Sequence, residues 1–128
     1  MEINYLAAFV ASLTGPVLGT LWYSVLFAKS WQHLSGVSEQ VMKKNMPKLA
    51  FFSYLLTLFM SINLAAFIGK DQSPLFGLIA GFAAGFGWVA ISIGINYLFE
   101  QKPLKLYLIN AGYFTVLLSI MGLIIGSM

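Results

Sequence analysis

Residues 72–99 read QSPLFGLIAGFAAGFGWVAISIGINYLF, a run of 28 residues that contains no charged side chain. A helix crosses a bilayer core about 30 Å thick with about 20 apolar residues. Ser73 followed by Pro74 is a typical helix start, because serine caps the first turn and proline is favoured at the first helical position. The stretch therefore predicts a transmembrane helix over about residues 75–99.

Three further uncharged runs flank this stretch, at residues 3–28, 49–69 and 106–128, so that the four runs cover 98 of 128 residues. Charged residues make up 9% of the chain, whereas soluble domains carry about 25%. This composition excludes a water-soluble fold. We expect an all-α integral membrane protein with a single domain over residues 1–128, in which four transmembrane helices at about 3–27, 49–69, 75–99 and 104–127 form a bundle.

The first uncharged run also has to be compared with a cleaved signal peptide. A signal peptide has a basic start and an apolar stretch of about 7 to 15 residues. Here the start holds Glu2 and no lysine, and the apolar stretch runs from Ile3 to Phe27. We therefore expect a retained transmembrane helix, kinked where Pro16 removes a backbone hydrogen bond.

The connection over residues 28–48 is amphipathic rather than apolar. Trp31, Leu34, Val37 and Val41 recur at helix-like spacing between charged residues. Ser38 has the character of a helix cap. We interpret this connection as a short interfacial segment on the lipid headgroups, anchored by Trp31; the alternative is a lid over a site.

The lysines predict the orientation. Six of the seven lie in the first and third connections or directly beside them, and only Lys70 lies in the second connection. Lysines of short loops favour the cytoplasmic side. Both termini are therefore expected outside.

Small residues follow one face of the third predicted helix. Gly77, Gly81 and Gly85 form two overlapping GxxxG steps, a spacing that lets helices approach closely in lipid. This face is expected to pack within the bundle, and the alternative is a seam between protomers in a homo-oligomer.

Polar and aromatic side chains gather in the cytoplasmic half of the predicted bundle. Asn96 and Glu100 are four residues apart and share a helix face, and the short connection after Glu100 lets Asn96 face Asn110. These side chains either line a polar cavity or form the aromatic belt and interhelical hydrogen bonds that many membrane proteins have. The candidate ligand-binding residues are Trp22, Tyr23, Lys29, Asn96, Glu100, Asn110 and Tyr113.

The sequence lacks the residues that most catalytic and metal-binding sites require. The chain has no cysteine and a single histidine, His33, so a metal site is not expected. All seven basic residues are lysines, which we interpret as topology signals rather than a nucleic-acid surface. No ionisable residue lies deep in a span, which argues against a proton-coupled transporter. We expect no cofactor, no catalytic residue and no enzymatic activity.

Two stretches resemble a known family. Residues 22–24 (WYS) with 27–31 (FAKSW), and residues 97–113 (YLFEQKPLKLYLINAGY), are similar to the motifs "WYSPLLFGKxW" and "YExRPLKLFLINAGY" of the bacterial domain of unknown function 1761 family. Val25 stands where that family often has proline, and Lys102 where it has arginine. The resemblance implies a four-span protein of the bacterial plasma membrane and implies no activity.

Two functional hypotheses follow. The first is a membrane binding or transport-like module, in which the polar and aromatic residues bind a small molecule or a lipid headgroup. The second is a structural or accessory subunit that assembles with itself or with another membrane protein through its glycine-rich helix faces. A cavity in the cytoplasmic half would favour the first hypothesis.

Overall fold

The computed structural model describes residues 2–128, and within these residues the secondary structure is helical throughout, with no strand. Four helical stretches are long and apolar enough to cross a membrane, and their bounds are Tyr5–Leu26, Glu39–Ile68, Pro74–Glu100 and Leu104–Ser127. The elements in chain order are α1 (Tyr5–Ser12), α2 (Thr14–Thr20), η1 (Leu21–Leu26), α3 (Ala28–Ser35), α4 (Glu39–Ile68), α5 (Pro74–Ala84), η2 (Gly85–Ala90), α6 (Ile91–Glu100) and α7 (Leu104–Ser127).

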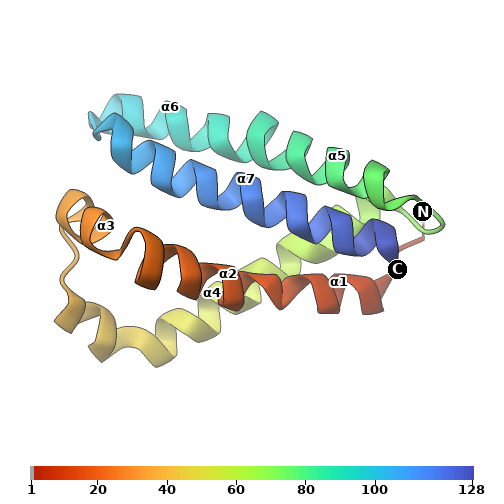
Figure 1. Ribbon diagram of the computed structural model, residues 1–128, viewed down its shortest axis with the longest axis horizontal. Helices are drawn as coiled ribbons and strands as arrows, with labels where there is room; N and C mark the ends of the chain where they lie inside the picture. The colour runs from red at the N-terminus through yellow and green to blue at the C-terminus, as the bar shows by residue number, and fades with distance from the viewer. Residues whose placement is uncertain (1) are drawn as a thin grey trace.

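Side-chain caps and left-handed residues mark the helix ends. Ser73 accepts a hydrogen bond from the backbone N–H of Phe76 at 3.0 Å, with Pro74 opening α5, as the sequence predicts. Ser38 caps α4 in the same way through Val41 at 3.2 Å. Gln101, in the turn after α6, has a φ of 58°, and the chain returns antiparallel to α6 as α7 (Figure 1).

The first stretch is broken near Pro16, where the sequence predicts a kink. Proline has no N–H to donate to the carbonyl four residues earlier, and α1 ends at Ser12 in that turn. Leu13 separates α1 from α2, and the stretch then widens into the π-helical turn η1.

The second stretch begins ten residues earlier than the span expected from hydropathy. Helix α4 starts at Glu39 and continues through Pro47 to Ile68. A proline kinks a helix without always ending it, and the Ser38 cap starts this helix in the polar segment. An ion pair between Lys43 and Glu39 at 3.0 Å lies on its first turns.

Helix α7 lies at the centre of the molecule. The stretch α5–η2–α6 runs along one side of α7, α1 and α2 lie along another, and α4 crosses these helices diagonally (Figure 1). Ten residues of α7 are buried, among them Leu117 and Met121. Three alanines of α1 with no exposed surface pack into the same core: Ala7, Ala8 and Ala11. Small side chains there allow the close helix approach that packing in lipid requires.

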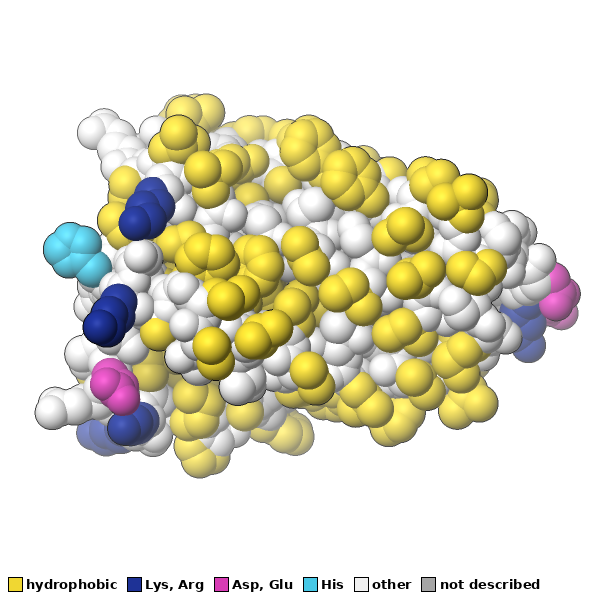
Figure 2. Space-filling view, viewed as in Figure 1, with side chains coloured by type: hydrophobic (Ala, Val, Ile, Leu, Met, Phe, Trp, Pro, Cys, Tyr) yellow, Lys and Arg dark blue, Asp and Glu magenta, His cyan; other side chains and the backbone are white. Residues whose placement is uncertain are grey.

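The outer surface is apolar along most of its length. Figure 2 shows hydrophobic side chains over the middle of the visible face and charged side chains at the two ends. Leu98 and Phe99 are 79% and 86% exposed. An apolar belt between charged ends is the surface that a bilayer requires.

Candidate functional site

Three glycines, Gly77 and Gly81 of α5 and Gly85 of η2, lie directly against α7. A Cβ atom at Gly81 would come within 2.8 Å of the carbonyl carbon of Leu118, and one at Gly85 within 2.9 Å of the Cα of Thr115. Gly77 faces Gly122 and Gly126 of α7 in the same way. The GxxxG face is therefore covered within the chain by α7, and the backbones approach too closely for any larger residue.

A polar and aromatic cluster joins η1, α6 and α7 near the end of the molecule that carries α3. We call Trp22, Tyr23, Tyr97, Asn110 and Tyr113 the aromatic cluster. The Tyr23 hydroxyl donates to Asn110 Oδ1 at 2.7 Å, and Asn110 Nδ2 donates to the Tyr97 hydroxyl at 2.7 Å. The Asn110 amide therefore bridges two tyrosines from different helices.

The other members of the aromatic cluster bind backbone carbonyls across helices. Trp22 Nε1 donates to the carbonyl of Ile109 at 2.8 Å, and the Tyr113 hydroxyl donates to the carbonyl of Gly15 at 3.1 Å. The rings of Tyr23 and Tyr113 lie 5.2 Å apart between centroids, and Tyr23 also contacts Trp31 of α3 at 5.6 Å. These contacts tie η1 and α3 to α7.

The π-helical turn η1 explains how Trp22 and Tyr23 can both reach α7. The N–H of Phe27 donates to the carbonyl of Trp22 at 2.9 Å, five residues back. A turn with this spacing holds more residues than an α-helical turn, so the rotation about the helix axis from one side chain to the next is smaller. As a result, neighbouring residues of η1 contact neighbouring residues of α7, Ile109 and Asn110.

The structure brings together four of the seven candidate residues from the sequence: Trp22, Tyr23, Asn110 and Tyr113. The other three, Lys29, Asn96 and Glu100, have exposed side chains. In the described part of the chain their side chains take part in no hydrogen bond or ion pair. The expected pairing of Asn96 with Asn110 is therefore wrong, because Asn110 bonds to Tyr97 instead.

Tyr97 is the cluster residue that the sequence analysis missed, and η2 gives the reason. On an α-helix without interruption, the face of Gly77, Gly81 and Gly85 would continue to Asn96. The π-helical turn η2 adds one residue to the helix at positions 85–90, which moves the packed face on by one residue. The partly buried residues after it are accordingly Val89, Ile93 and Tyr97, while Trp88, Ser92 and Asn96 are exposed.

The aromatic cluster is closed except at Tyr97, which also lines a surface groove. Among residues 2–128, every buried polar side-chain atom has a hydrogen-bond partner. The two surface hollows described below are not lined by Trp22, Tyr23, Asn110 or Tyr113. The cluster interior thus holds its own side chains in place and offers no unpaired group to a ligand.

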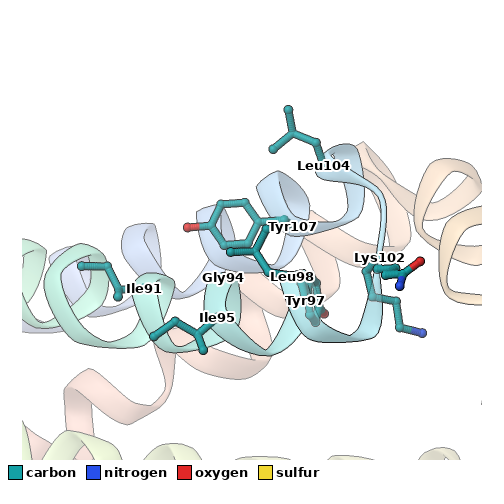
Figure 3. Close-up of a pocket in the computed structure, with 9 residues that line it drawn as sticks. Ile91, Gly94, Ile95, Tyr97, Leu98, Lys102, Leu104 and Tyr107 are labelled. Atoms are coloured by element: carbon teal, nitrogen blue, oxygen red, sulfur yellow. The ribbon is translucent and has the colours of Figure 1, made fainter.

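A groove of about 530 Å³ lies beside the aromatic cluster, between α6 and the start of α7 (Figure 3). The Tyr107 hydroxyl donates to the carbonyl of Ala90 at 3.0 Å. Gly94 leaves room for the Tyr107 ring, since a Cβ at Gly94 would lie 3.1 Å from it. We call this hollow the α6–α7 groove; its lining residues are Ile91, Gly94, Ile95, Tyr97, Leu98, Gln101, Lys102, Leu104 and Tyr107.

A second, more open hollow of about 500 Å³ lies at the turn between α3 and α4 and includes Lys29 and His33. Among residues 2–128, no group of three His, Asp or Glu side chains is placed to hold a metal ion.

These features define the class of the protein: a small all-α chain with four helices long and apolar enough to cross a membrane, joined by an interhelical cluster of aromatic and amide side chains. The family model described as "Protein of unknown function (DUF1761)" matches residues 6–126, and the chain belongs to this family. No curated protein and no solved structure matches the chain.

Proposed function

We propose that this chain is a multi-pass protein of the bacterial plasma membrane with four spans in one bundle and both termini outside. The segments that carry six of the seven lysines, residues 28–48 and 100–105, lie at one end of the molecule (Figure 1). Figure 2 shows dark blue side chains concentrated at that end. Lysines favour the cytoplasmic side. Helix α3, whose last turn carries His33 and which contains Trp31, would lie at that surface.

Within this membrane protein, the function that the geometry supports best is non-catalytic binding of a small amphipathic molecule in the α6–α7 groove. The observation that carries the proposal is the lining of the groove, which joins an apolar wall to polar groups at one end, Gln101 and Lys102. Binding sites commonly combine a mainly apolar lining with a few polar groups that orient the ligand. A groove of about 530 Å³ is large enough for such a ligand.

The aromatic cluster has a supporting role in this proposal. Tyr97 lines the groove and accepts a hydrogen bond from Asn110 at 2.7 Å. Asn110 is in turn held by Tyr23. The cluster therefore fixes one wall of the groove, and a site whose walls are held by such contacts binds at a lower entropic cost.

Native mass spectrometry of the detergent-extracted protein tests this function, because it detects a retained small molecule as added mass. Ile95→Trp fills the groove and should abolish the retained mass. Leu108→Trp is the matched control, since Leu108 is similarly exposed, 59% against 52% for Ile95, but does not line the groove. An equal loss in both variants, or no retained mass in the wild-type protein, would contradict the proposal.

A second candidate function is an accessory subunit that assembles with itself or with another membrane protein. The glycine face is not free for this purpose, because α7 covers it. The first half of α4 instead presents exposed apolar side chains, among them Phe51, Phe52 and Leu56, and residues 43–53 are exposed throughout. The same mass spectra test this function: a stable dimer or a co-purifying subunit, lost on Phe51→Ser and Phe52→Ser, would favour it.

A further inference from the structure

We propose that the occupant of the α6–α7 groove is an anionic phospholipid of the cytoplasmic leaflet. Its phosphate would lie at Lys102 and one acyl chain would follow the apolar wall. This inference rests on the proposed binding function of the groove and names the chemical class of its ligand.

The groove presents an apolar wall along the helix axis. Ile91, Ile95 and Leu98 of α6 line one side, and Leu104 with the ring of Tyr107 lines the other. From position 91 to position 98 a helix rises about 10 Å, at about 1.5 Å per residue. Figure 3 shows these side chains set in series along α6, with Lys102 at one end of the series. This arrangement suits a chain-like apolar ligand with a polar head at one end.

The charge at the polar end is positive and unpaired. Among residues 2–128 the only ion pair joins Lys43 to Glu39, so Lys102 has no carboxylate partner. Glu100, the one acid of this turn, does not line the groove. Helix α7 begins directly after Pro103 without a side-chain cap, and the positive end of its dipole adds to the field of Lys102. The head that fits is therefore an anion.

The position of the groove favours a membrane lipid over a soluble anion. The groove opens between α6 and α7 on the apolar outer surface, beside Leu98, which is 79% exposed. A small inorganic anion would contact Lys102 but leave the apolar wall uncovered. A phospholipid fills both parts, and anionic lipids are attracted to lysines at the cytoplasmic surface.

Titration of the detergent-solubilised protein with phosphatidylglycerol or phosphatidylcholine, followed by native mass spectrometry, tests this inference. We expect phosphatidylglycerol adducts on the wild-type protein and an affinity lower by about fivefold in Lys102→Gln, the effect typical of one lysine near an anionic surface. Lys105→Gln is the matched control, because it removes the same charge one turn further along at a position that does not line the groove. Lys102→Arg keeps the charge and should bind as the wild type does.

Each alternative outcome has a distinct meaning. Equal binding of phosphatidylglycerol and phosphatidylcholine, both lost in Ile95→Trp, would overturn the choice of an anionic lipid while the groove remained a binding site. Equal losses of phosphatidylglycerol affinity in Lys102→Gln and Lys105→Gln would show that the effect comes from the overall charge of the protein. This result would overturn the assigned position of the phosphate. Displacement of phosphatidylglycerol by inorganic phosphate would overturn the assignment of a lipid and indicate that the ligand of the groove is a free anion. Adducts that are unchanged in Ile95→Trp would contradict the binding function of the groove itself.

Discussion

The side-chain amide of Asn110 donates to the Tyr97 hydroxyl and accepts from the Tyr23 hydroxyl, each at 2.7 Å. One residue of α7 thereby joins α6 to η1, two segments that are far apart in the sequence. Because Asn110 is only partly buried and both of its polar atoms are paired, its amide stabilises the contact between helices without an unpaired group.

Asn110→Leu should lower the free energy of unfolding by about 1 kcal/mol, the scale of polar contacts between membrane helices. Both hydrogen bonds of the amide are lost, and the two tyrosine hydroxyls lose their partner. Thermal unfolding in detergent measures the effect. Asn96→Leu is the matched control, because Asn96 is exposed and should change stability little. Equal destabilisation by the two substitutions would contradict the geometry of the cluster.

Gly81→Leu should prevent correct packing of α5 on α7. A Cβ at this position would already come within 2.8 Å of the carbonyl carbon of Leu118, and backbone atoms cannot yield without separating the helices. The yield of monodisperse protein in size-exclusion chromatography measures the outcome. Gly87→Leu serves as the control, since a Cβ at Gly87 meets nothing within 4 Å. A normal yield of the Gly81 variant would show that the two helices can separate.

Ser61→Leu should disrupt the contact between α4 and α1. Ser61 has no exposed surface, and its hydroxyl donates to the carbonyl of Ala8 at 2.7 Å. A leucine there has no space and typically costs about 1 to 3 kcal/mol through overpacking. Thermal unfolding in detergent again provides the measurement. Ser53→Leu, on the exposed part of the same helix, should leave the midpoint unchanged.

The topology makes a separate prediction. Reporter fusions at Met128 should register outside the cell, and reporters inserted after Gln101 should register in the cytoplasm, because lysines concentrate around that turn and in residues 28–48. Cytoplasmic reporters at both positions would contradict a fourth span. The reverse orientation would move the α6–α7 groove to the outer leaflet.

Much of the architecture could be predicted from hydropathy and charge. The four long apolar helices, the start of α5 at Ser73 and Pro74, the break near Pro16 and the membership of the family all follow from residues that lie close together in the sequence. Hydropathy predicts the start of α4 too late, because an average of hydropathy gives the apolar part of a helix and not the polar turns that precede it from Glu39.

The residues of the aromatic cluster could be predicted only in part. The sequence predicts Trp22, Tyr23, Asn110 and Tyr113 as candidates because all four fall in the same half of the predicted bundle, where polar side chains of neighbouring helices bond to one another. That Tyr97 rather than Asn96 bonds to Asn110 could be seen only in the structure, because it depends on the extra residue in η2.

The positions of the long apolar helices could thus be derived from the sequence alone. The cost of burying a charge or an unpaired backbone group in lipid depends on each residue and its near neighbours. The partners of each helix face, the closed cluster and the groove between α6 and α7 were decided by tertiary packing. A π-helical turn changes which of the following residues face the neighbouring helix, so the bond between Asn110 and Tyr97 could not be derived from an unbroken α-helical repeat.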